Sequence, residues 1–385
     1  MPKKQVQRLK NLLINTWNLC YLAAMLRLRK LDLVQFKNYA ARSFSFSEKV
    51  VAITGNNGIG KTNLIDAIYY LCFTRSYFTT GDAMNSMKGT QGFSISGELS
   101  AGDNHTLVRV LLRETGKKEV SCNGVQPDRM ADHLGKFPAV MIAPDDVELI
   151  TGGSELRRKQ IDALLCQLDP YYLSALITYN KILQQRNSYL RQTAEGTKRN
   201  DTLLDVLDES LLSAGNTIFE KRKNFLPQFI EKVISLYTQF AGKEEAVSIQ
   251  YESSLLLDTF QQLLKKSREK DYLLQRTSSG IHRDNLAITF GDTTFKAIAS
   301  QGQRKSLLFA LKLAEAEILK LEKGFAPLLL LDDVFEKLDA TRMLQLLEYV
   351  CKTLKPQLFI TDTHPERVND VFNKLAVAYQ LCNLE

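Results

Sequence analysis

The sequence lacks three features that would place the chain in a special class. No apolar run reaches the roughly 18 to 20 residues needed to cross a bilayer, so a membrane span is not expected. The six cysteines form no CxxC pair and the four histidines are dispersed, which argues against a structural metal site or a disulfide framework. Internal repeats and low-complexity tracts are also missing. We therefore expect a cytoplasmic globular protein with reduced thiols and, at 385 residues, one large or two moderate domains.

Charge gives little guidance to function. The formal net charge is +7, but residues 1–24 contribute +4 through four basic residues and no acid, which leaves a mildly basic +3 for the rest. A bulk charge of this size does not identify a nucleic-acid binder. The first segment loosely resembles a signal peptide, yet polar residues interrupt its apolar part. We favour an upstream start, with Met25 as the natural beginning and residues 1–24 as an extension outside the fold.

The periodicity of apolar residues divides the chain into segments of different texture. Strand patterns dominate the first 153 residues and return after residue 277, whereas the segment between them is almost entirely helical, with a surface turn at 192–200. We expect an α/β body that is split by an inserted, mainly helical second domain. The expected parts are the extension 1–24, the first half of the body 25–153, the insert 154–275 and the second half of the body 276–385.

The strongest motif is a phosphate-binding loop. Gly55-Asn56-Asn57-Gly58-Ile59-Gly60-Lys61-Thr62 matches G-x-x-x-x-G-K-[ST] in full and lies between a buried strand and a helix. Glycines let backbone N–H groups curve around an anion, and the start of the following helix adds a favourable dipole. Lys61 is predicted to reach the β/γ-phosphates and the Thr62 hydroxyl to bind Mg²⁺. The alternative, a Gly-rich turn with an incidental lysine, does not explain this context.

A second motif supplies carboxylates. The apolar run 328–331 is followed directly by Asp332 and Asp333. Acids at this position are typical of a buried strand whose carboxyl end lies beside a phosphate loop. Asp332 is predicted to hold Mg²⁺, and Asp333 to orient or deprotonate the attacking water. The alternative is a solvated Asp-Asp turn, which the presence of the phosphate loop disfavours.

A third motif opens a long amphipathic helix. Ser300 and Gln303 form a capping-box pattern, and Gly302 stands inside the first turn. A helix start with a glycine and polar donors is suited to anion recognition. Because the chain already has a phosphate loop, this end is predicted to face the same phosphate or that of a second copy.

Together these motifs resemble those of ABC-type ATPases, whose signature helix contacts the γ-phosphate bound by the opposite subunit. Ser300, Gly302 and Gln303 match that motif, while Gln301 replaces its first glycine. An ATPase body that is split by a long helical insert resembles the SMC-like branch of these ATPases and not the transporters. Within that branch the chain resembles the RecF recombination-repair family from Met25 onward, through five segments in the right order. These segments are LDLVQFKNY, AIYYLCFTRSY, APDDVELITGGSELRRKQID, GIHRDNL and LLLLDDVFEKLD.

The resemblance implies roles for further residues. Asn63 and Arg75 would lie near the phosphates, Arg75 alternatively near bound DNA, and His364 would sense the γ-phosphate or simply cap a helix. A loop near residues 143–146 would take the place of the Q-loop of ABC-type ATPases. Glu336, Leu338 and Asp339 would form a D-loop that crosses the dimer interface. The chain departs from the family pattern at Gly153-Ser154, Ile281 and Asn285 and in its extra N-terminus.

The resemblance also implies partners and a reaction. ATP would close two copies into a dimer on gapped, single-stranded or double-stranded DNA, and slow DNA-stimulated hydrolysis would reopen it. RecO and RecR would be partners in loading RecA. Basic residues of the insert offer DNA contacts, although each such cluster taken singly is more often a solvated helix face. The candidates are Lys181, Arg186, Arg191, Lys221, Arg222, Lys223, Lys265, Lys266 and Arg268.

Two other interpretations remain open on sequence alone. A transporter ATPase subunit would place its signature motif much nearer the phosphate loop than the 239 positions that separate Lys61 from Ser300. A nucleotide-gated scaffold with negligible hydrolysis is the second alternative. The presence of both Asp332 and Asp333 favours a competent ATPase.

Overall fold

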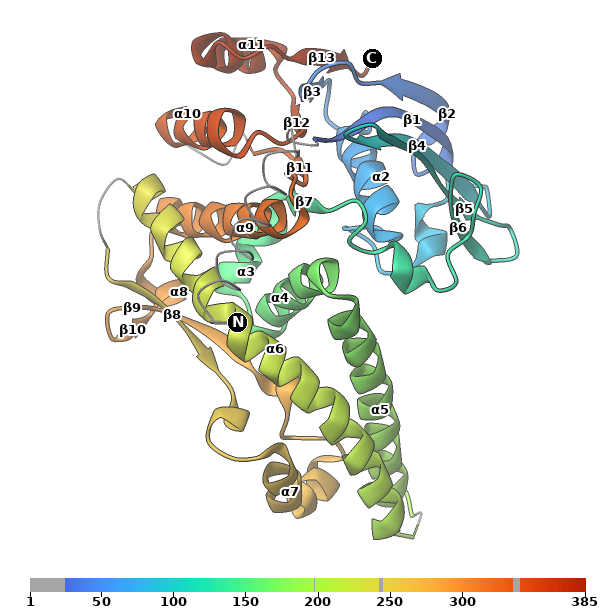
Figure 1. The fold of residues 1–385 in the computed structure, drawn as a ribbon, viewed down its shortest axis with the longest axis vertical. Helices are drawn as coiled ribbons and strands as arrows, with labels where there is room; N and C mark the ends of the chain where they lie inside the picture. Colours follow the sequence, from blue (N-terminus) through green and yellow to red (C-terminus); the bar gives the residue numbers. More distant parts are fainter. Residues whose placement is uncertain (1–24, 197, 242–244, 335–339) are drawn as a thin grey trace, which may run out of the picture. The chain divides into compact units, whose positions relative to one another are not determined.

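The computed structural model describes residues 25–196, 198–241, 245–334 and 340–385, which fold into two compact units. Among the described residues, unit 1 comprises 25–127, 316–331 and 349–385. Unit 2 comprises residues 128–315 and 332–348. Each unit is therefore assembled from separate stretches of sequence (Figure 1). None of the described helices is both long enough and apolar enough to cross a membrane.

Unit 1 contains a five-stranded antiparallel sheet in the order β2-β1-β4-β5-β6. The buried side chains of β1 change parity between Leu28 and Leu31, and a β-bulge between Leu28 and Lys30 accounts for this change. The bulge keeps one face of the strand on the core despite the broken alternation. The strands are β1 (Leu26–Phe36), β2 (Tyr39–Ser45), β4 (Phe93–Ala101), β5 (Asn104–Leu112) and β6 (Lys118–Cys122).

Unit 1 also contributes four parallel strands in the order β13-β3-β12-β11. Every residue of β3, β11 and β12 is buried, as expected for parallel strands covered on both faces. The phosphate loop follows β3, and His364 follows the neighbouring strand β12. The elements are β3 (Val50–Thr54), α2 (Lys61–Phe73), β11 (Leu328–Leu331), the π-helix η6 (Tyr349–Leu354), β12 (Leu358–Asp362), α11 (Pro365–Leu375) and β13 (Gln380–Asn383).

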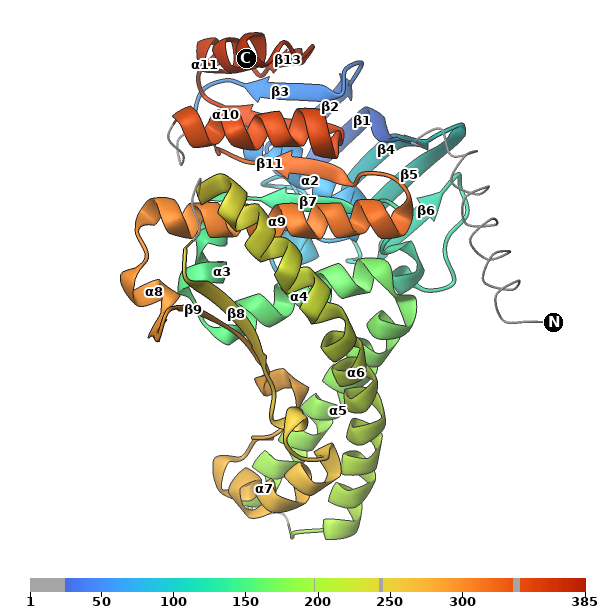
Figure 2. The same cartoon turned by 60° about the vertical axis from the view of Figure 1, so that its left-hand side comes forward.

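Unit 2 contains the helices predicted across residues 154–275. Helix α5 ends at Ala194 and α6 begins at Asp201, so the turn lies where the sequence predicts it, and the two helices lie side by side (Figures 1 and 2). Strand β8 (Val247–Glu252) was not predicted; it joins a small antiparallel sheet in the order β10-β9-β8. The other elements are β7 (Ala139–Ile142), η3 (Pro144–Val147), α3 (Glu148–Thr151), α4 (Ser154–Leu168), α5 (Pro170–Ala194), α6 (Asp201–Ala241), α7 (Phe260–Leu274), β9 (Asn285–Phe290), β10 (Thr293–Thr294), α8 (Phe295–Ile298), α10 (Ala340–Glu348) and the first part of α9 (Gln301–Lys323).

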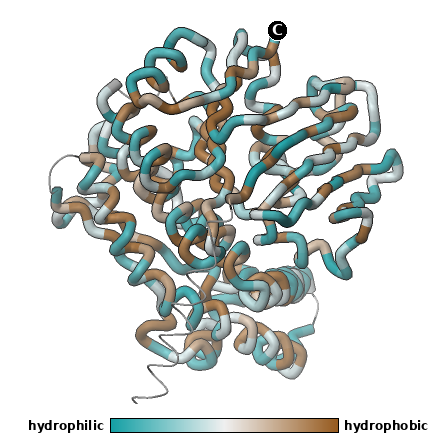
Figure 3. Tube along the Cα trace, turned by 45° about the horizontal axis from the view of Figure 1, so that its top comes forward, coloured by the Kyte–Doolittle hydropathy of each residue, from teal (hydrophilic) through white to brown (hydrophobic). Residues whose placement is uncertain are grey.

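Hydrophobic and hydrophilic residues alternate in short stretches along the described chain instead of separating into long blocks (Figure 3). In α6, for example, Leu211, Ile218 and Leu226 are fully or almost fully buried, whereas Asn216, Glu220 and Asn224 between them are exposed. This is the pattern of helices that cover a core with one face.

Two buried arginines join the helices of unit 2. The guanidinium of Arg186 donates to Asp208 at 2.6 Å and to Asp271 at 2.8 Å. That of Arg222 donates to Asp162 at 2.7 Å and to Asp284 at 2.8 Å. Burying such charges is tolerated because each is paired and hydrogen-bonded.

Candidate nucleotide-binding site

The Gly55–Thr62 loop depends on its glycines. Gly55, Gly58 and Gly60 have φ angles of 143°, 80° and 117°, which other residues rarely adopt. A Cβ at Gly55 would lie 2.6 Å from the carbonyl oxygen of Leu384. The loop therefore has the backbone shape of an anion cradle, and helix α2 begins at Lys61, directly behind it.

Lys61 is folded back into the loop. Its ammonium donates to the carbonyl oxygens of Gly55 at 2.7 Å and Asn56 at 3.1 Å, and the residue is buried. A positive charge is thus held within the curve of the glycine backbone. Thr62 and Asn63 follow in the first turn of α2, where their side chains are half-buried. This arrangement fits a polyphosphate that is bound with a divalent cation.

The turn between β1 and β2 braces this loop, which the sequence did not lead us to expect. The Asn38 amide donates to the Ile59 carbonyl at 2.8 Å and accepts from the Asn63 amide at 2.8 Å. The Tyr39 hydroxyl donates to the Gly60 carbonyl at 3.0 Å. Burial raises the pKa of Tyr39 to about 12, so this hydroxyl keeps its proton at neutral pH. Lys37, Asn38 and Tyr39, at the end of the segment LDLVQFKNY, were the sequence signal that could have predicted this contact.

Arg75 is presented by a loop that α2 itself organises. Asp66, fully buried in α2, pairs with the Lys37 ammonium at 2.5 Å and accepts from the Ser76 hydroxyl at 2.6 Å and the Tyr77 amide at 2.7 Å. Arg75 lies between α2 and these anchored residues and is exposed. Its predicted role near phosphate or DNA stays a prediction, while Asp66 is a supporting residue that the sequence pattern did not single out.

His364 occupies the N-cap position of α11 and is exposed. Its backbone amide donates to Asp362 at 2.6 Å, but its side chain makes no capping hydrogen bond. His364 therefore has the N-cap position that the helix-capping alternative expects, but its imidazole donates or accepts no capping hydrogen bond. The position at the end of β12, beside β3, is compatible with the predicted γ-phosphate sensor, which remains untested.

Asp332 and Asp333 directly follow β11. Asp332 is buried, and its amide donates to the Ile142 carbonyl at the end of β7 at 2.8 Å. Asp333 adopts a φ of 50°, an uncommon conformation for a non-glycine residue. Both belong to unit 2, whereas the Gly55–Thr62 loop belongs to unit 1, so a magnesium site that joins Thr62 and Asp332 stays a prediction.

Within the described ranges, no group of three or more His, Cys, Asp or Glu side chains could hold a metal ion by itself. Magnesium would therefore need ligands from the nucleotide, as the predicted Thr62 and Asp332 pair already implies. The predicted D-loop residues Glu336, Leu338 and Asp339 lie outside the described residues.

The capping box at the start of α9 is confirmed. The Ser300 amide donates to the Gln303 side chain at 2.8 Å, and the Gln303 amide donates to the Ser300 hydroxyl at 3.2 Å. The side-chain Nε2 of Gln303 donates to the Glu245 carboxylate at 2.9 Å. A Cβ at Gly302 would lie 2.0 Å from a guanidinium nitrogen of Arg342, so the glycine leaves room for an arginine of α10. Neither Glu245 nor Arg342 was predicted.

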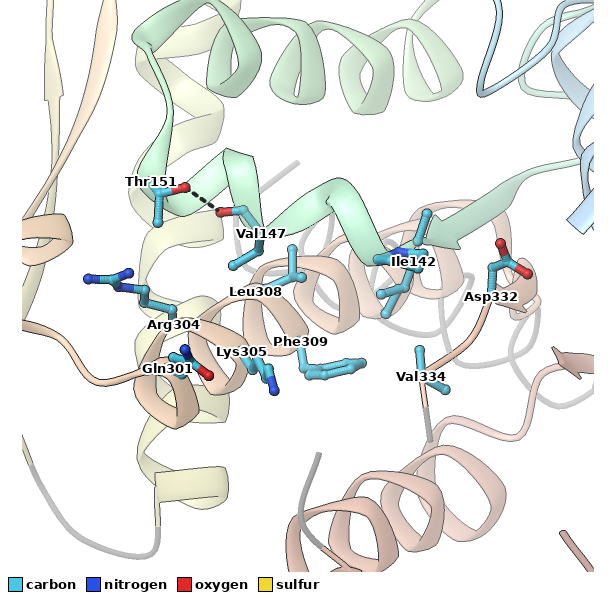
Figure 4. Close-up of a pocket in the computed structure, with 12 residues that line it drawn as sticks. Ile142, Val147, Thr151, Gln301, Arg304, Lys305, Leu308, Phe309, Asp332 and Val334 are labelled. Carbon is cyan, nitrogen blue, oxygen red and sulfur yellow. Dashed lines mark hydrogen bonds between the residues drawn. The ribbon is translucent and has the colours of Figure 1, made fainter. Parts of the chain in front are cut away.

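A cavity of 470 Å³ in unit 2 lies between the start of α9 and the segment after β7 (Figure 4). Leu308, Phe309 and Ile142 give it apolar walls, and Asp332 lies at one side. Asp332, the predicted metal ligand, and α9, the predicted signature helix, therefore line the same cavity of unit 2.

The structure corrects several of the predicted DNA contacts. Arg186 and Arg222 are buried in ion pairs and cannot contact DNA from the surface. Lys221, Lys266 and Arg268 pair with acidic side chains. Charge along the sequence did not distinguish the two buried arginines from surface residues such as Lys221 and Lys266, which are exposed. The other exposed candidates are Lys181, Arg191, Lys223 and Lys265.

Comparison with known proteins identifies relatives along most of the chain. Residues 27–381 match the family model described as the RecF/RecN/SMC N terminal domain. The chain is 42% identical to the DNA replication and repair protein RecF of Flavobacterium johnsoniae, over 93% of this chain and 100% of the relative. It is 39% identical to the RecF protein of Porphyromonas gingivalis, over 93% of this chain and 98% of the relative.

Solved structures show the same relationship. The recombination mediator protein RecF-ATP in the RecFOR pathway has a TM-score of 0.82 and 30% identity, covering 90% of this chain and 94% of the other. An Smc head domain from Pyrococcus yayanosii has a TM-score of 0.52 and 12% identity, which shows a shared fold alone. The fold prediction is confirmed, and the interpretation as a transporter ATPase subunit is set aside. By the extent and identity of these matches, the chain belongs to the RecF family of DNA replication and repair proteins.

Proposed function

We propose that this protein binds ATP and Mg²⁺ at the Gly55–Thr62 loop and uses slow, DNA-stimulated hydrolysis as a switch in recombinational repair. The observation that carries the proposal is the loop itself, whose positive-φ glycines surround the Lys61 ammonium. A solved RecF protein that is 30% identical was determined with ATP, which supports the choice of nucleotide. The relatives are named for DNA replication and repair, which supports the process.

Each residue of the site has a defined task in this proposal. ATP supplies the phosphoanhydride bond whose hydrolysis drives the switch. Lys61 turns from the loop carbonyls to the β/γ-phosphates, with Asn63 and Arg75 adding polar and positive contacts around them. Thr62 and Asp332 would provide oxygen ligands for Mg²⁺. Asp333 orients the attacking water and accepts its proton at the carboxylate, and His364 senses the γ-phosphate from the end of β12.

The signature end of α9 serves a second copy of the chain. Ser300, Gly302 and Gln303 would face the γ-phosphate held by the partner's phosphate loop, so that ATP closes a homodimer. The closed dimer would stay on gapped, single-stranded or double-stranded DNA until hydrolysis. With RecO and RecR, it would promote loading of RecA. The reciprocal capping box supports this proposal because it fixes Ser300 and Gln303 at the helix start.

Two substitutions separate binding from assembly. Lys61→Ala is expected to abolish ATP binding in isothermal titration calorimetry, because the loop loses its positive charge. Ser300→Arg is expected to keep ATP binding but to block ATP-dependent dimerisation in analytical ultracentrifugation. Normal ATP-dependent dimerisation of Ser300→Arg would contradict the trans arrangement. Circular dichroism spectra that match the wild type provide the folding control.

Hydrolysis is tested separately from assembly. Asp333→Asn is expected to bind ATP and dimerise while its rate of phosphate release falls, because the carboxylate that accepts the proton is gone. Negligible phosphate release by both the wild type and Asp333→Asn, with gapped DNA present, would favour the nucleotide-gated scaffold, and equal, substantial release would contradict the role of Asp333.

A further inference from the structure

A buried charge cluster in unit 2 connects α9 with the segment that follows β7. Its members are Asp146 on η3 and Lys312 and Glu315 on α9, each less than one-tenth exposed. The Lys312 ammonium lies 3.6 Å from the Asp146 carboxylate. Lys312 and Glu315 are three positions apart and so share one face of the helix. Gln160 of α4 also interacts with Glu315.

Asp146 transmits this contact to the main chain near Asp332. The oxygen of Asp146 that faces Lys312 also accepts the amide of Ala143 at 2.9 Å. Ala143 adjoins Ile142, whose carbonyl accepts the amide of Asp332 at 2.8 Å. An unbroken chain of hydrogen bonds, covalent bonds and one ion pair thus runs from Asp332 to the middle of α9, entirely within unit 2.

We propose that Lys312 is a positioning residue that holds the Asp332 main chain in a fixed relation to the signature end of α9. The proposal rests on the proposed function, in which Asp332 serves the chain's own nucleotide and Ser300 serves the partner's. Helix α9 runs without interruption from Gln301 through Lys312, so a displacement at Asp146 would reach Ser300 as a movement of a rigid element. The cluster therefore links the two nucleotides of a dimer through one chain.

The cluster holds two carboxylates for one ammonium. Glu315 has an oxygen that is buried and makes no hydrogen bond. Burial raises the pKa of Glu315 to about 7, an increase that Asp146 adds to and that Lys312 and Gln160 oppose. When Glu315 carries a proton, it does not compete with Asp146 for the ammonium. When Glu315 ionises, it competes for that ammonium, and the link through Asp146 weakens.

The test is a double-mutant cycle with a control from the same helix. Lys312→Met and Asp146→Asn are each expected to weaken ATP-dependent dimerisation at least fivefold, with circular dichroism spectra that match the wild type. Because both act through one contact, the double variant should be no weaker than the single ones. Lys323→Met, in the last turn of α9, is expected to dimerise normally. Normal dimerisation of Lys312→Met, or effects that multiply in the double variant, would overturn the proposal.

A second variant covers the case in which Lys312→Met does not fold. Glu315→Gln keeps the side-chain volume and removes the ionisation. The wild-type dimer is expected to weaken severalfold between pH 6 and pH 8, and the Glu315→Gln dimer to be insensitive over that range. A merely structural role would not remove this pH dependence, so a wild-type pH profile in Glu315→Gln would overturn the proposal.

If the wild type itself does not dimerise with ATP, the proposed homodimer is wrong, and the positioning role of Lys312 is tested by a different measurement. The same variants are then compared by their rate of ATP hydrolysis, which depends on Asp332. Slower hydrolysis by Lys312→Met than by Lys323→Met would support positioning of Asp332, and equal rates would overturn it.

Discussion

Replacing Asn38 by alanine tests whether the β1–β2 turn preorganises the phosphate loop. The substitution removes two hydrogen bonds, one to the Ile59 carbonyl and one from the Asn63 amide. Asn38 is exposed, so each bond is worth about 0.5 to 1 kcal/mol net. The loop conformation therefore loses about 1 to 2 kcal/mol, which predicts an ATP Kd that rises about five- to thirtyfold.

Isothermal titration calorimetry with ATP and Mg²⁺ measures this effect directly. Tyr39→Phe removes the single bond to the Gly60 carbonyl, worth about 1 kcal/mol, so its Kd should rise about fivefold. Asn104→Ala is the matched control, because Asn104 is exposed at the start of β5 in the same unit. If Asn38→Ala bound ATP as tightly as Asn104→Ala, the loop would not depend on the turn and the reasoning would be refuted.

Three other substitutions test separate parts of the structure. Gly55→Ala should abolish ATP binding in calorimetry, because its Cβ would meet the main-chain oxygen of Leu384 at 2.6 Å and its φ is 143°; retained affinity would contradict this. The pKa of Glu315 is raised from 4.5 to about 7, so the folded protein binds this proton more tightly than the unfolded chain does. The free energy of unfolding, measured in urea, should therefore fall from pH 5 to pH 8 by up to about 3 kcal/mol. Glu315→Gln should lack that fall, and an equal fall would count against it. Arg222→Met should lose about 3 to 5 kcal/mol in urea unfolding because two buried carboxylates lose their partner, whereas exposed Lys223→Met should change little; similar losses in both would refute the buried pairing.

Much of the fold could be predicted because its signals are local. The phosphate loop is a contiguous motif, the buried strands are contiguous apolar runs, and the helices of residues 154–275 show their own periodicity. Strand β8 escaped prediction because its six residues follow a 41-residue helix and are stabilised by pairing with β9, forty residues further along. Local preference does not record such a partner.

The candidate site was predicted in its loops but not in its supports. Asn38 reaches Ile59 from another strand pair, and Arg342 lies on Gly302 from another helix. Such contacts depend on tertiary packing, which spacing along the sequence does not reveal. The same reason explains the misplaced DNA contact at Arg222, since a basic residue in a helix has the same local pattern whether it is exposed or buried.

The parallel pairing of β13 with β3 has a consequence for synthesis of the protein. Residues 50–54 are made early, yet their neighbours at 380–383 are made more than three hundred residues later. The amide of Leu384 closes the arrangement by donating to the Thr54 carbonyl at 2.8 Å, immediately before the phosphate loop. The bonds that join residues 380–384 to β3 therefore form only after these residues have emerged from the ribosome. A truncated translation product that lacks residues 380–384 would carry every nucleotide motif and still lack the strand that supports them.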